Sequence, residues 1–112
     1  MELRYYQTSS GRRPFVEWLA AMADQKARAR IAARLAMIAA GSFGDTGPVG
    51  GGVLELRISW GPGYRVYFAR VGETVVLLLC GGDKRTQDDD IKDAKRHFDD
   101  FKRRTAQARG RR

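Results

Sequence analysis

Two hydrophobic periodicities divide the chain into predicted helices and strands. Apolar residues at a helical spacing of three and four predict helices from Pro14 to about Met22, from Lys26 to Ala40, and from Thr86 to about Phe101. Pro14 suits a first helical turn, Asp24 and Thr86 are suitable N-caps, and Gly41 is a suitable stop. The predicted apolar stripes are Phe15, Trp18, Leu19 and Met22; Ala27, Ile31, Leu35 and Ile38; and Ile91, Ala94, Phe98 and Phe101.

Alternating and continuously apolar stretches predict four strands. Residues 2–7, 53–60 and 64–71 alternate or are rich in aromatic and β-branched residues, and residues 74–80 are apolar throughout. A continuously apolar strand is expected to be buried on both faces and central in its sheet. Between helix and sheet lies the glycine-rich segment 41–52, which lacks the GxxxxGK[ST] pattern of a P-loop and is interpreted as a flexible crossover.

The alternation also predicts which side chains share a face. If residues 61–63 form a three-residue loop, Trp60 pairs with Tyr64 and Arg57 lies opposite Tyr67. A two-residue turn at 72–73 would pair Val71 with Thr74 and Arg65 with Cys80, with Gly82 on the side of Arg65. The sequence therefore predicts a concave polar patch beside small residues, made by Arg57, Arg65, Tyr67 and Lys84.

Charge changes the interpretation of this patch. The chain of 112 residues has a formal net charge of +8. Residues 1–40 hold seven lysines and arginines against three acidic residues, 41–83 hold three against four, and 84–112 hold eleven against six. Arginines in the nearly neutral middle therefore favour an anionic ligand over an ordinary solvated face. Their planar guanidinium groups suit phosphate, and a tyrosine could stack on a base.

Composition bounds the remaining alternatives. The length predicts one domain, 1–104, followed by a basic tail, 105–112, without structure. A single cysteine, Cys80, excludes an internal disulfide and a cysteine-based metal site, and favours a reducing, cytoplasmic setting. We expect neither signal peptide nor membrane span. His97 is expected to be structural, and Asp88, Asp89 and Asp90 to favour a helix start over metal binding.

Four segments together resemble the RelE/ParE superfamily of toxins from bacterial type II toxin–antitoxin modules, with the HigB-like addiction-module killer proteins most similar. These are FVEWLA (15–20), GDTGPVGGGVLELRI (44–58), GPGYRVYF (61–68) and LLLCGGDKRTQDDDI (77–91). The resemblance spans about residues 2–101. It implies an α+β, RelE-like fold: an N-terminal strand and an antiparallel helix hairpin, then a three-stranded antiparallel meander and a C-terminal helix.

The resemblance also implies a function. RelE-like toxins cleave mRNA in the ribosomal A site without a metal or other cofactor, the ribose 2′-OH attacking the adjacent phosphate. Arg57, Arg65 and Lys84 match the basic active face, and Tyr67 is our candidate to take the place of a tyrosine that RelE carries near Ile91. Further expected RNA contacts are Tyr64, Arg85, Lys92, Lys95 and Arg96.

Two departures leave other functions open. The second lysine that RelE carries near Glu55 and the tyrosine that it carries near Ile91 are both missing here. Arginine and lysine have pKa values too high for an efficient general base, so the proton-transfer step has no obvious agent. The alternatives are a ParE-like, non-catalytic inhibitor of DNA gyrase and a plain RNA-binding module. The implied partners are the ribosome with its mRNA and a cognate antitoxin, usually a helix-turn-helix protein encoded next to the toxin.

Overall fold

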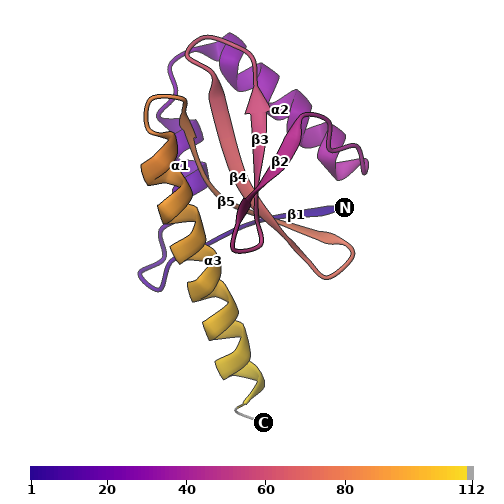
Figure 1. Ribbon diagram of the computed structural model, residues 1–112, viewed down its shortest axis with the longest axis vertical. Coiled ribbons are helices and arrows are strands. Elements are labelled where there is room, and N and C mark those ends of the chain that lie inside the picture. Colours follow the sequence, from indigo (N-terminus) through magenta and orange to yellow (C-terminus); the bar gives the residue numbers. More distant parts are fainter. Residues whose placement is uncertain (111–112) are drawn as a thin grey trace.

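A five-stranded mixed sheet carries helices on both faces in the computed structural model, which describes residues 1–110 (Figure 1). The strands are β1 (Glu2–Tyr5), β2 (Thr46–Gly50), β3 (Val53–Ile58), β4 (Tyr64–Val71) and β5 (Val75–Asp83). The helices are α1 (Pro14–Ala20), α2 (Gln25–Ala39) and α3 (Gln87–Arg109). The strand order is β1-β5-β4-β3-β2, with β1 parallel to β5 and the other neighbours antiparallel. This confirms the α+β, RelE-like fold.

The continuously apolar strand β5 lies inside the sheet, between β1 and β4, as its composition predicted. Val76 and Leu78 pack into one apolar core with side chains from α1 and α2. Leu77 and Leu79 point the other way and pack with Ala94 and Phe98 of α3. The sheet therefore has an α1/α2 face and an α3 face.

The predicted helix stripes are confirmed. Asp24 caps α2 by accepting bonds from the backbone N–H groups of Lys26 and Ala27, and Gly41 ends the segment with φ near +93°. Thr86 stands at the N-cap of α3, but its hydroxyl donates to the Asp90 carboxylate, 2.5 Å away, and caps no backbone group. Met22 lies beyond the end of α1 and still packs on the core.

Two predictions about chain segments were wrong. The glycine-rich segment 41–52 contains edge strand β2, which forms a hairpin with β3. Its three glycines 50–52 all have positive φ, which makes the tight return possible. The tail expected from residue 105 onward is helical through Arg109, because α3 continues in register past Phe101. Residues 111 and 112 of that predicted tail lie outside the described residues.

The strand register differs from the prediction by two residues, which preserves every face. Tyr64 pairs with Ile58, so Arg57 lies opposite Arg65, and Tyr67 lies opposite Glu55. The physical reason is Trp60, which leaves the strand. Its indole N–H donates to Asp24 over 3.2 Å, and the Arg30 guanidinium stacks 4.0 Å from its ring centre.

The predicted pairing of β4 with β5 was also wrong. Val71 pairs with Val75, and Arg65 pairs with Gly82. An irregularity between Tyr67 and Phe68 shifts the register along the way. The prediction that Gly82 lies on the side of Arg65 is confirmed.

Two glycines at the end of β5 let helices approach the strand on both faces. A β-carbon on Gly81 would lie 2.2 Å from the Trp18 indole, and one on Gly82 would lie 1.8 Å from the Asp90 carboxylate. The space that the sequence suggested for a ligand is therefore filled by side chains of α1 and α3.

We predict that Gly81→Ala destabilises the protein by about 1–3 kcal/mol, because the Trp18 ring must move to admit a methyl group. Urea denaturation measures the change. Gly110→Ala is the matched control, since Gly110 has φ −73° and room for a β-carbon 3.6 Å from its nearest neighbour. Equal stability of the two variants would contradict the packing described for α1.

Candidate active site

A buried carboxylate organises the end of the sheet where the two strand arginines meet. Glu55 on β3 is 3% exposed. Its Oε1 lies 3.3 Å from Arg57 Nη1 and 3.7 Å from Arg65 Nε. Its Oε2 accepts hydrogen bonds from the Tyr67 hydroxyl at 3.3 Å and from the Gln87 amide at 2.7 Å. We call these five residues the Glu55 cluster.

Arg57 is the more accessible of the two arginines, with 35% of its side chain exposed. Its guanidinium lies against the backbone of Gly47 on β2, where a β-carbon would come within 3.2 Å. Asp45 binds it on the solvent side, accepting from Nε at 3.0 Å and contacting Nη2 at 2.9 Å. The hydrogen bond to Asp45 is the main reason why the pKa of Arg57 lies above its usual value.

Arg65 is more enclosed, with 13% of its side chain exposed. Its buried Nε has no hydrogen-bond partner and faces Glu55 at a distance too long for a hydrogen bond. Nη1 donates to the carbonyl of Tyr64 at 3.4 Å and borders the Gly63 turn. Guanidinium groups that lie directly opposite across two strands repel each other. Glu55 between them offsets that cost.

Tyr67 does not occupy the exposed position that the sequence suggested. Its side chain is fully buried under α3, and its hydroxyl donates to Glu55. Burial, reinforced by the charge of Glu55, raises the pKa of Tyr67 strongly. The prediction of an open concave patch was therefore wrong at this residue, because α3 covers that part of the sheet.

Lys84 lies close to Arg65 across the Gly63 turn. A β-carbon on Gly63 would lie 3.6 Å from Lys84 Cβ and 3.8 Å from Arg65 Nη1. Lys84 is exposed and also lines a polar hollow of about 410 Å³ at the start of α3. Arg57, Arg65 and Lys84 thus gather at one end of the sheet, as the sequence predicted.

The other predicted RNA contacts are dispersed. Tyr64 packs on the α1/α2 face, edge-on to Trp18, and so points away from Arg65. Arg85 is exposed and paired with Asp83 at 2.8 Å, which lowers the pKa of Asp83. The remaining three side chains belong to α3. Lys92 is exposed, Lys95 lies across the Gly50–Gly51 turn, and Arg96 pairs with Asp93.

Sequence reasoning missed three members of this site: Glu55, Gln87 and Asp45. The alternation did place Glu55 on the face of Arg57, but its burial follows only from the position of α3. Gln87 was missed because it is the first residue of that helix, and its contact with Glu55 depends on where the helix docks. Asp45 reaches Arg57 through strand β2, which the sequence interpretation did not contain.

The three consecutive aspartates, Asp88, Asp89 and Asp90, lie in the first turn of α3, and His97 packs against an aromatic ring. His97 stacks on Tyr6 with ring centres 4.7 Å apart, and burial lowers the pKa of His97. Within residues 1–110, no three His, Cys, Asp or Glu side chains come together in a way that could hold a metal ion. Cys80 is buried, which raises the pKa of its thiol to about 12.

The arrangement suits binding of an anion at the surface. Arg57 contacts two carboxylates, Asp45 and Glu55, and Arg65 shares Glu55 with it. Lys84 adds a further positive charge. The Asp45 pair is exposed, and exposed ion pairs contribute little to stability, so a phosphate could replace Asp45 at low cost. Arginine can hold a phosphate through two parallel hydrogen bonds.

The fold and the Glu55 cluster together define a RelE-like α+β protein with a cationic site at one end of its sheet. The chain belongs to the family described as "Phage derived protein Gp49-like (DUF891)", whose model matches residues 17–108. This family is associated with toxin–antitoxin systems. A protein of Haemophilus influenzae named "Uncharacterized protein" is 49% identical over 81 residues, which cover 72% of this chain and 82% of the relative.

Across the described part of the chain, no helix combines the length and apolar character that crossing a bilayer requires.

We predict that Glu55→Gln lowers the free energy of unfolding by about 3 kcal/mol, because it leaves two arginines beside a group that no longer carries charge. Equilibrium urea denaturation gives the value. Glu73→Gln in the exposed β4–β5 turn is the control and should change stability by less than about 0.5 kcal/mol. A Glu55→Gln protein as stable as the wild type would show that the carboxylate does not hold the cluster.

Proposed function

We propose that this protein is the toxin of a type II toxin–antitoxin pair and cleaves mRNA on the ribosome, as HigB-like toxins do. The observation that carries this proposal is the pair Arg57 and Arg65, directly opposite on neighbouring strands and held by one buried carboxylate. Like charges directly opposite on neighbouring strands repel each other, and a bound phosphate would offset that repulsion further than Glu55 alone does. Membership in a family associated with toxin–antitoxin systems supports the toxin role in this proposal.

The proposed reaction needs no metal. The ribose 2′-hydroxyl loses its proton to water as its oxygen bonds to the adjacent phosphorus. The bond from phosphorus to the 5′-oxygen breaks, and that oxygen takes up a proton from water. Negative charge accumulates on the phosphoryl oxygens in the transition state. Groups already oriented toward that charge stabilise it without reorganisation, which is often the largest catalytic contribution. Arg65 is proposed for this role, and Arg57 and Lys84 are proposed to hold the neighbouring backbone.

Glu55 is proposed as a positioning residue. Its two oxygens already contact Arg57, Arg65, Tyr67 and Gln87, so it fixes the guanidinium groups and does not meet the substrate. Tyr67 is likewise proposed as a positioning residue, because its buried hydroxyl donates to Glu55. The RNA-binding surface is proposed to continue from Lys84 along the start of α3. The further contacts there would be Arg85, Lys92, Lys95 and Arg96.

The proposed partners are the ribosome with its mRNA and a cognate antitoxin of the helix-turn-helix class. A net charge of +8 suits association with ribosomal RNA and with an acidic inhibitor alike.

We predict that Arg65→Ala slows mRNA cleavage on the order of 10²–10³-fold, as removal of one preorganised donor does. Arg65→Lys should recover little, since an ammonium group cannot make the bidentate contact. Arg57→Ala and Lys84→Ala should have smaller effects. Primer extension on mRNA from translating ribosomes measures the cuts.

Arg70→Ala is the matched control, because Arg70 lies on the same strand, is exposed, and stacks on Phe43 away from the cluster. It should cut like the wild type. Equal cutting by Arg65→Ala would remove this site from the mechanism. If the wild type makes no cuts and the purified protein inhibits gyrase supercoiling, a ParE-like function replaces the nuclease.

A further inference from the structure

The second half of α3 extends beyond the sheet that its first half covers. Figure 1 shows the helix running beside the strands and projecting past them toward the C-terminus. Ala94 and Phe98 are buried against the sheet, whereas Phe101 and Thr105 are only half-buried and Ala108 is exposed. The apolar stripe of α3 therefore continues farther than the surface it packs on.

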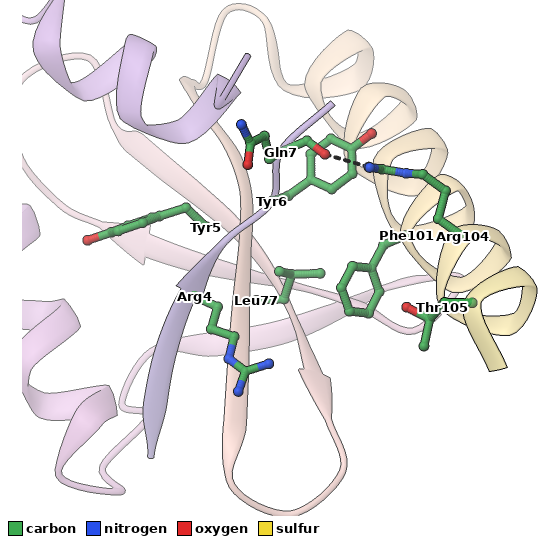
Figure 2. A pocket seen from close by; sticks show the side chains of 9 residues that line it. Arg4, Tyr5, Tyr6, Gln7, Leu77, Phe101, Arg104 and Thr105 are labelled. Atoms are coloured by element: carbon green, nitrogen blue, oxygen red, sulfur yellow. Dashed lines mark hydrogen bonds between the residues drawn. The ribbon is translucent and has the colours of Figure 1, made fainter. Parts of the chain in front are cut away.

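A groove lies between this part of α3 and strand β1 (Figure 2). Its volume is about 400 Å³. Leu77 of β5 forms the floor, Tyr6 closes one end, and Phe101, Thr105 and Ala108 form the helical wall. A second hollow of about 320 Å³ lies on the other side of α3, between the helix and the β4–β5 turn, and shares Phe101 and Thr105.

The groove is rigidly framed at its inner end. The Tyr6 hydroxyl donates to Asp100 at 2.6 Å, and Arg104 reaches Asp100 and the carbonyl of Gln7. These contacts tie the end of β1 to the middle of α3. The groove is thus preformed, which lowers the cost of binding.

The rim of the groove is basic. Arg4 and Arg104 border it directly, with 61% and 39% of their side chains exposed. Residues 101–110 contain four lysines and arginines and no acidic residue. Glu2, the acidic partner of Arg4, is largely exposed, so this pair contributes little and can be exchanged. Arg104 keeps its bonds to Asp100 and to the Gln7 carbonyl.

We infer that this groove binds an acidic amphipathic helix of a partner protein. The apolar floor and wall would take the hydrophobic face of the helix, in the helix-in-groove mode of recognition, and the basic rim would pair with its acidic flanks. A second copy of this chain would bring like charges together. RNA would use the basic rim and could stack a base on Phe101, but it would gain little from the aliphatic side chains of Leu77 and Ala108.

This surface lies apart from the Glu55 cluster. Gln87 and Ala108 are 21 positions apart on one helix, which corresponds to about 30 Å at the rise of an α-helix. A partner bound in the groove would leave Arg57, Arg65 and Lys84 uncovered. The inference therefore goes beyond the proposed nuclease function and does not depend on it.

A fluorescent synthetic peptide tests the groove directly. The probe consists of leucine and glutamate, about four helical turns long, with leucines at the i, i+3, i+4 and i+7 positions. Fluorescence polarisation measures its affinity for the full-length protein. Ala108→Glu places a negative charge and extra volume in the groove. Gln107→Glu makes the same change in charge one residue away, at a position that lines neither hollow.

We predict that Ala108→Glu weakens peptide binding by about tenfold or more, whereas Gln107→Glu changes it less than about twofold. Equal weakening by both variants would show general attraction between charges and overturn the inference. Absence of peptide binding to the wild type would overturn it too. An RNA oligonucleotide that binds more tightly than the peptide, and loses affinity with Ala108→Glu, would assign the groove to RNA.

The two proposals can fail separately. Ala108→Glu should leave cleavage of mRNA on ribosomes unchanged, and Arg65→Ala should leave peptide binding unchanged. Circular dichroism of each variant confirms that α3 remains folded.

Discussion

A carboxylate buried in a sheet must be surrounded by hydrogen-bond donors or positive charges, since leaving it unpaired costs several kcal/mol. Glu55 imposes this constraint on the protein. Its oxygens contact two arginines, a buried tyrosine and the first residue of α3. The strands β3 and β4 must then pair so that Arg57 and Arg65 lie opposite each other, and α3 must begin where Gln87 can reach the carboxylate. One charge thus links strand register, helix position and the proposed active site.

The same helix connects the site to the rest of the surface. Its first turn joins the Glu55 cluster, its middle closes the core through Ala94 and Phe98, and its last turns extend past the sheet. A protein built in this way has two separate surfaces on one rigid element. In the proposed functions, the cationic site would meet RNA while the apolar groove about 30 Å away would stay open to a partner.

The order of elements and the faces of the strands could be predicted from the sequence, because both depend on local periodicity. The register could not, because Trp60 fits the strand pattern and leaves it to contact Asp24 and Arg30. Strand β2 was hidden in a glycine-rich segment that gains order only by pairing with β3. Arg57, Arg65 and Lys84 were found from charge and alternation. The burial of Tyr67 and Glu55 depends on α3, a contact distant in sequence that no local pattern encodes.

The central claim is that Glu55 and Arg65 act as one unit, and a double-mutant cycle measures this most directly. Free energies of unfolding for the wild type, Glu55→Gln, Arg65→Met and the double variant give the interaction energy of the pair. The account predicts a favourable coupling of about 1–3 kcal/mol, within the range for residues in one network. Additive effects of the two substitutions would contradict it, because Arg65 would then be held in place by something other than the buried carboxylate.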